Sequence, residues 1–286
     1  GYTFTALNDG KPVIAGDTIA LQKGIRDPHI FRGPDGAFYL SMTDLHIYAQ
    51  KDGFRDTEWE RDGKEYGWGN NRGLVLMKSW DLINWKRTNA RFDLLSAGLG
   101  DTLAKLYEYR VISGGEPDYS LNMAAFAQGK LCYQLIERFG GAACGEVMRG
   151  EAGTALEQVM DAIFIYAGFT SIMGVGDHVA AAHALFDGFT VLEKTREFGH
   201  GLLVGYGNLC LLALENRSDA EILTAIQLAK QCGVPVSLNE IASLNEEEIA
   251  EIVETAIQTP DMANMPFPVT IEMLLNAIQR VDRLAG

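Results

Sequence analysis

The chain has 286 residues, 47% of them hydrophobic and 22% charged, and its formal net charge is −14. This length suits one large domain or two ordinary ones, and no apolar run approaches the roughly 18 residues that suggest a membrane span. We therefore expect a globular chain without a membrane partner. The negative charge argues against a nucleic-acid partner as well, because nucleic acids bind to basic surfaces.

The four cysteines, Cys132, Cys144, Cys210 and Cys232, show no CxxC spacing. Such isolated cysteines favour buried or free thiols in a reducing compartment over disulfides. No positively charged segment followed by an apolar one opens the chain, so we expect no secretory signal peptide. Together these features predict a cytoplasmic protein.

Charge and residue types change abruptly near residues 92–96. Residues 1–94 carry 13 basic and 13 acidic side chains, whereas residues 95–286 carry 11 basic and 25 acidic ones. All four tryptophans precede this point, and all four cysteines follow it. One domain rarely divides in this way, so we predict two domains, residues 1–94 and 95–286.

The first part contains short apolar runs separated by turn residues. Residues 29–32 and 37–43 flank a four-residue turn at 33–36, where proline occupies the second position. This pattern predicts a β-hairpin, and residues 73–78 read as a further strand. We therefore expect a small antiparallel β unit here.

The second part has longer segments with apolar residues at helical spacing. Expected helices cover residues 101–111, 120–138, 153–172, 178–192, 201–215, 219–231, 246–258 and 271–284. Residues 218–221 form a capping-box pattern, and Asn245 can cap the next helix. The glycine pairs at 114–115 and 140–141 read as turns between helices. The predicted fold class is α+β in two segments, a small β unit followed by an all-α bundle.

The first part carries several separated motifs in order: residues 26–31, 33–36 and 38–40, then 73–79 and a loop that ends at Trp85. Over residues 12–94 they resemble the first blade of the β-propeller glycoside hydrolases of family 43. The resemblance implies that Asp27 is the general base of an inverting hydrolysis. That reaction also needs a protonated carboxyl group on the other side of the sugar ring. In the family, this group comes from a residue of a later blade. The alternative is that Asp27 fixes a turn before Pro28.

Three short motifs in the second part carry candidate metal ligands. Asp101 follows two glycines at an expected helix start, His183 lies among alanines, and His200 lies between two glycines. Two neutral imidazoles and one carboxylate suit catalytic zinc, or ferrous iron as a facial triad, and leave a position open for water or substrate. From residue types alone, ordinary core or surface histidines are the alternative.

Together these motifs resemble the C-terminal domain of the iron- or zinc-containing polyol dehydrogenases, most closely the glycerol dehydrogenases. The resemblance runs from residue 95 through residues 264–266 to the end. It implies that Asp101, His183 and His200 bind zinc or iron, which would polarise the hydroxyl of a small polyol. It also implies NAD as the hydride acceptor. Asp187, four residues after His183, could orient that ring or be an exposed carboxylate. A homo-oligomer is left open.

The resemblance also sets an expectation about the cofactor. The family binds its dinucleotide in an N-terminal α/β domain, where a glycine-rich loop follows a strand. The propeller-like segment takes that place here, and no GxGxxG follows a strand. We therefore expect hydride transfer to fail or to be very weak.

Three functions follow from these patterns. The first is a metal-dependent polyol dehydrogenase-like domain, NAD-linked by resemblance. The second is a glycoside hydrolase of arabinosidase or xylosidase type, or a glycan-binding module. The third is a non-catalytic fusion or scaffold. A natural fusion, an engineered chimera and a misassembled reading would each produce this arrangement.

Overall fold

The computed structural model describes residues 6–20, 25–32, 36–43, 74–87, 92–115, 118–151, 153–174, 178–196 and 198–286. The chain divides into two compact units, residues 1–90 and residues 91–286. Among the described helices, none combines the length and the apolar character that crossing a membrane requires. The two units are described separately.

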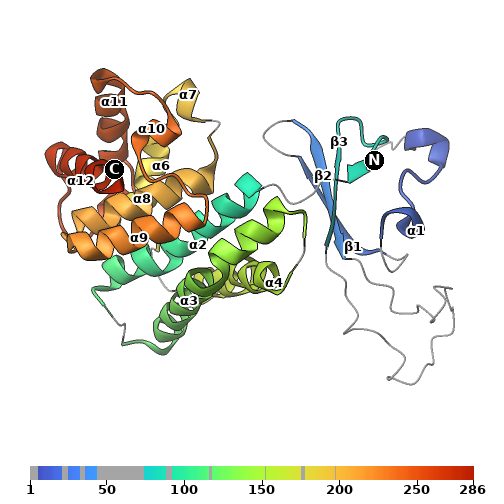
Figure 1. Ribbon diagram of the computed structural model, residues 1–286, viewed down its shortest axis with the longest axis horizontal. Coiled ribbons are helices and arrows are strands. Elements are labelled where there is room, and N and C mark those ends of the chain that lie inside the picture. The colour runs from blue at the N-terminus through green and yellow to red at the C-terminus, as the bar shows by residue number, and fades with distance from the viewer. Residues whose placement is uncertain are drawn as a thin grey trace, which may run out of the picture. The chain divides into compact units, whose positions relative to one another are not determined.

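The first unit is built on a four-stranded antiparallel sheet (Figure 1). Its strands are β1 (Arg26–Arg32), β2 (Phe38–Thr43), β3 (Leu74–Ser79) and β4 (Lys86–Arg87), paired in that order, after the short helices η1 (Leu7–Gly10) and α1 (Gly16–Ile19). Side chains alternate between faces along β2 and β3, so that Met42, Val75 and Met77 form a small buried cluster. The expected hairpin and third strand are confirmed. The turn predicted around Pro34 lies outside the described residues.

A tight turn joins β3 to β4. The Asp81 carboxylate accepts hydrogen bonds from the backbone N–H groups of Ile83 and Asn84 at 2.9 and 2.7 Å. The bonds from Asn84, then that from Ile83, hold the pKa of Asp81 well below its usual range. Trp85 Nε1 donates to the carbonyl of Leu82 at 2.8 Å, which fixes the indole against the turn.

The second unit is all-helical, as expected (Figure 1). Its elements are α2 (Phe92–Ser113), α3 (Ser120–Met148), α4 (Thr154–Asp161), the π-helix η3 (Ala162–Tyr166), α5 (Ala167–Met173), α6 (Ala181–Phe189), α7 (Glu193–Arg196), α8 (His200–Leu214), α9 (Asp219–Gln231), α10 (Leu238–Ile241), α11 (Glu246–Ile257), η4 (Met262–Asn264) and α12 (Ile271–Ala285). Helix α8 contacts α2, α6, α9 and α12. It is buried nearly all round, which explains why its sequence is apolar on every face.

Two predicted boundaries in this unit are wrong. Helix α2 begins at Phe92, nine residues before the expected start at Asp101, and α3 continues through Gly140 and Gly141, which were expected to form a turn. Both errors have the same physical cause. Glycine lowers helix propensity by about 1 kcal/mol, but close packing offsets that cost. A Cβ on Gly140 would lie 2.7 Å from Cys232 Sγ, so α3 needs glycine there.

Both predicted helix caps are present. Ser218 Oγ accepts from the backbone N–H of Glu221 at 3.3 Å, and the Glu221 carboxylate accepts from the backbone N–H of Ser218 at 3.1 Å. Asn245 and Glu248 form the same reciprocal pair at the start of α11. Each box satisfies two N–H groups that a helix start otherwise leaves unpaired.

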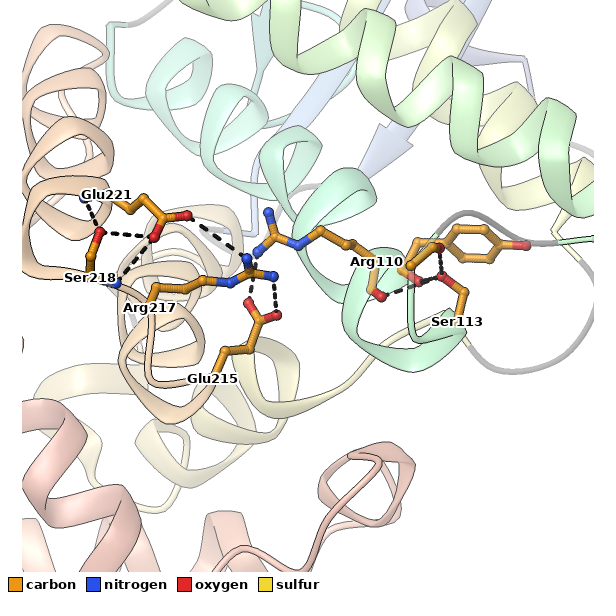
Figure 2. A network of polar contacts seen from close by, with 8 residues as sticks. Arg110, Ser113, Glu215, Arg217, Ser218 and Glu221 are labelled. Carbon is orange, nitrogen blue, oxygen red and sulfur yellow. Dashed lines mark hydrogen bonds and ion pairs between the residues drawn. The ribbon is translucent and has the colours of Figure 1, made fainter.

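Figure 2 shows a polar network that links α2 to the end of α8 and the start of α9. Arg110 Nη2, on α2, donates to Glu215 Oε2 at 2.7 Å, and Arg217 Nη2 donates to Glu215 Oε1 at 2.8 Å. The Glu215 side chain is only 8% exposed, and the two arginines compensate its buried charge. The network fixes α2 against α8.

The four cysteines lie in the helical unit, and all are buried and free of disulfides. Burial raises the pKa of Cys132 and of Cys144 to about 11. Because the thiolate is the reactive form of cysteine, these two thiols are chemically inert at neutral pH. They contribute to the core.

Candidate metal centre

Three helices of the second unit bring the predicted ligands together. Asp101 lies in the first half of α2, His183 in the first turn of α6, and His200 is the first residue of α8. One donor atom from each lies within 4.8 Å of the donor atoms of the other two. Asp101 Oδ1 is 3.4 Å from Nε2 of His183 and 3.4 Å from Nε2 of His200.

These separations fit a single ion. Two ligand atoms that are each about 2.0–2.1 Å from a tetrahedral zinc ion are about 3.4 Å apart. Both distances from Asp101 match that value. The side chain of His200 is half exposed, whereas that of His183 is 12% exposed. The three donors therefore fit a metal on geometry and chemistry, and the side near His200 is open to a further ligand.

Close approach of the helix backbones brings the ligands into range. A methyl group on Gly100 would overlap the carbonyl of Gly201, so α2 and α8 cross with their backbones in contact directly beside Asp101 and His200. A Cβ on Gly207 would lie 2.6 Å from the carbonyl oxygen of Ala182, so the backbones of α6 and α8 are also in close contact. These glycines thus allow the three helices to approach closely enough for the ligands to meet.

Two asparagines fix the backbone next to the ligands. Asn208, buried in α8, donates from Nδ2 to the carbonyl of Gly100 at 2.9 Å. Asn264 donates from Nδ2 to the carbonyl of Val179, just before α6, at 2.9 Å. Both bonds join segments far apart in the chain, so they position Asp101 and His183 by tertiary contact.

His200 is fixed by its backbone and by an aromatic neighbour. Gly199, its N-cap residue, has φ of 114°, in the left-handed region that favours glycine. Phe186, three residues after His183 on α6, meets the His200 ring edge to face with centroids 4.2 Å apart. The packing limits rotation of a histidine that is otherwise half exposed.

Glu108 is a site residue that the sequence analysis missed. It is fully buried, and its Oε2 lies 2.6 Å from Nδ1 of His183. Its Oε1 accepts hydrogen bonds from the backbone N–H groups of Ala180, Ala182 and His183 at 2.7, 3.0 and 3.1 Å. A signal was present, because residues seven apart on a helix share a face, and Glu108 lies two turns after Asp101.

Asp101 and His183 affect each other's pKa values. Burial disfavours the ionised form of Asp101, but hydrogen bonds from His183 and His200 and the charge of Lys105 hold its pKa well below the usual range. Burial likewise disfavours protonated His183, yet the hydrogen bonds to Asp101 and Glu108 raise its pKa to about 9. The pocket therefore favours positive charge at its centre, as a cation site must.

The other predicted site residue, Asp27, lies in the sheet unit. It is an exposed residue of β1 with φ of 51°, at a register shift between Arg26 and His29. Thr43 Oγ1 donates to Asp27 Oδ2 at 3.3 Å. Asp27 therefore lies in a β-bulge. Its role as a general base stays a prediction.

Comparison with known proteins gives the two parts of the chain different relatives. A protein-family model related to family 43 and described as "Probable glycosyl hydrolase domain" matches residues 1–110. That match runs past the end of the sheet unit and into α2. The front of the chain is therefore similar to the glycosyl hydrolase domains that its motifs resemble.

The remainder resembles glycerol dehydrogenases. Those of Pseudomonas putida and Citrobacter freundii are 33% and 31% identical over 208 and 205 residues, each covering 67% of this chain and 53% of the relative. The crystal structure of a probable glycerol dehydrogenase from Sinorhizobium meliloti 1021 superposes with a TM-score of 0.61 at 29% identity, over 68% of this chain and 56% of that chain. The helical unit is thus a polyol dehydrogenase-like domain. The chain spans about half the length of the curated relatives it matches.

Proposed function

We propose that the domain of residues 95–286 binds one divalent metal ion, zinc or iron, through Asp101, His183 and His200. The single observation that carries the proposal is the convergence of these three donors, with Asp101 Oδ1 3.4 Å from both imidazole nitrogens. The buried Glu108 behind His183 supports it, because metal-binding histidines usually donate their other ring N–H to a carboxylate or carbonyl. The names of the relatives support a small polyol as the substrate.

Asp101, His183 and His200 would contribute differently to the metal site. When bound, the metal would act as a Lewis acid that lowers the pKa of a coordinated hydroxyl group. Asp101 supplies the negative charge that offsets part of the ion's charge. His183 holds its Nε2 toward the centre while Nδ1 faces Glu108. His200, on the open side, leaves room for the hydroxyl of a polyol.

Metal content tests this proposal. Purified protein is stripped with a chelator, incubated with zinc or with ferrous iron under anaerobic conditions, desalted and analysed for metal by mass spectrometry. We expect about one equivalent per chain in the wild type and a loss of at least tenfold in the Asp101→Asn, His183→Ala double variant. Replacing His178, which lies outside the triad, by alanine should leave the content unchanged. Equal metal in wild type and double variant would refute the proposal.

NAD-linked oxidation of glycerol is the activity that the relatives suggest, and it is a separate proposal for this chain. It is measured as NADH formation from glycerol and NAD by the zinc-loaded protein. The double variant supplies the background rate. A rate above that background would assign a dehydrogenase activity, and a rate equal to it would limit the function to metal and hydroxyl binding.

Hydrolysis of glycosides is the second candidate function, and the match over residues 1–110 favours it. Asp27 would be the general base, which requires its carboxylate to activate water. Aryl arabinosides and xylosides are the substrates to assay. Activity that is lost in Asp27→Asn would assign the base, whereas equal rates in both proteins would leave Asp27 with its structural place in the bulge.

We also propose a cellular compartment for the protein and the kinds of partner that it lacks. Four buried thiols without disulfides suit the reducing cytoplasm. A net charge of −14 argues against a nucleic-acid partner. Homo-oligomer formation stays a prediction, to be measured by light scattering.

A further inference from the structure

The contacts of Glu108 divide between its two oxygens. Oε1 accepts hydrogen bonds from three backbone N–H groups at the start of α6, and Oε2 contacts Nδ1 of His183. The side chain is completely buried, so water cannot replace either set of contacts. One carboxylate therefore anchors both the backbone that carries His183 and the ring of the same residue.

We propose that Glu108 is a positioning residue that locks His183 in the tautomer with its proton on Nδ1. A carboxylate only accepts hydrogen bonds, so Nδ1 must be the donor at 2.6 Å. The lone pair of the neutral ring then lies on Nε2, the nitrogen that faces Asp101. The inference rests on the proposed metal site and adds what makes His183 competent to bind an ion.

The three backbone donors fix which atom of residue 108 faces the His183 ring. A glutamine at position 108 has nearly the same shape, but its amide has one acceptor and one donor end. The oxygen must face the N–H groups of Ala180, Ala182 and His183, because an NH2 group there would leave them unpaired in the interior. The NH2 group then faces Nδ1, which must become the acceptor. The ring proton moves to Nε2 and blocks the ligand position.

The first test compares the metal affinity of wild type and Glu108→Gln. Zinc is titrated against a chromogenic chelator, and cobalt(II) binding is followed by its visible absorption. We expect the variant to bind about 10- to 100-fold more weakly. Glu251→Gln, which removes one exposed negative charge from α11, is the matched control and should bind as the wild type does. Equal affinity of wild type and Glu108→Gln would overturn the inference and leave the proposed metal site intact.

A double-variant cycle separates positioning from a purely structural role. In a His183→Ala background there is no ring to orient, so adding Glu108→Gln should cause no further loss of cobalt affinity. A further tenfold loss there would show that Glu108 acts through the fold rather than through His183, and would overturn the proposal.

The tautomer itself can be measured directly in the wild type. Nitrogen-15 NMR of histidine-labelled, metal-free wild type, followed through a pH series until the ring signals stop changing, distinguishes a neutral ring with its proton on Nδ1 from one with its proton on Nε2. We expect Nδ1–H in the wild type, with His183→Ala used to assign the signal. Nε2–H in the wild type would overturn the inference. If the wild type binds no metal but shows Nδ1–H, the proposed function fails and the tautomer lock stands.

Discussion

At the scale of single residues, Asp282 on α12 joins three helices of the bundle. Its Oδ1 accepts a hydrogen bond from Tyr206 Oη, on α8, at 3.0 Å, and another from the backbone N–H of Leu238, at the start of α10, at 3.1 Å. Tyr206 is completely buried. Burial raises the pKa of Asp282 above its usual value of 3.8, even though both hydrogen bonds favour the charged form. The contacts stabilise the fold, and the charge opposes it.

The opposing effects of burial and hydrogen bonding at Asp282 predict how stability should change with pH. Because the folded-state pKa of Asp282 lies above the unfolded one, folding favours its protonated form, and its contribution to stability falls as pH rises above 3.8. Asparagine keeps the single accepting oxygen and removes the charge. We expect Asp282→Asn to be at least as stable as the wild type at pH 7, with the difference shrinking toward pH 3. Asp282→Ala should cost about 1–3 kcal/mol. Urea unfolding across this pH range measures both variants, and a large loss in Asp282→Asn would contradict the account.

At the scale of elements, the crossing of α2 and α8 decides whether the ligand side chains meet. A methyl group on Gly201 would overlap the carbonyl oxygen of Ala97, which is backbone and cannot rotate away. The helices would have to separate, and Asp101 and His200 with them. Gly168, in α5, offers a contrast, because nothing lies within 4 Å of its Cβ position.

Two glycine-to-alanine changes therefore have opposite expected effects. Gly201→Ala should lower the free energy of unfolding by about 1–3 kcal/mol through overpacking and should weaken zinc binding. Gly168→Ala should raise the free energy of unfolding by up to about 1 kcal/mol, because alanine has the better helix propensity. Urea unfolding and chelator competition provide the two readouts. A harmless Gly201→Ala would show that the backbones are not in close contact there.

At the scale of the whole molecule, the hydrophobic cores follow the division of the chain. The main core cluster draws all its residues from positions 95–285 of the described chain, and the sheet cluster draws its own from positions 19–85. No residue is shared between these two clusters. The helical unit therefore has the core that independent folding requires.

We accordingly expect residues 91–286, expressed alone, to fold and to bind zinc as the full chain does. Circular dichroism should show a helical spectrum, and the urea midpoint should lie close to that of the helical unit in the full chain. Zinc affinity should agree within about threefold, a difference of less than 1 kcal/mol. An unfolded or metal-free fragment would show that the front of the chain completes the helical unit.

Much of this molecule follows from local sequence. Apolar spacing predicted the bundle, and the caps at Ser218 and Asn245 followed from residue types within three positions of each other. The three candidate ligands lie in short motifs with small neighbours, and the resemblance of these motifs to those of the polyol dehydrogenases identified them as a ligand set. These signals are local, so a single sequence contains them.

Only the tertiary structure decided the rest. Helix α2 extends back to Phe92 and α3 runs through Gly140 because neighbouring helices pack against those glycines, a gain that local propensity does not include. In the sequence, Glu108 is an acidic residue of a helix, and none of its neighbours along the chain identifies its partners. Its partners begin 72 residues later, at Ala180, and only folding brings them to it. The sequence determined which side chains could bind a metal, and the packing of α2, α6 and α8 decided that they meet.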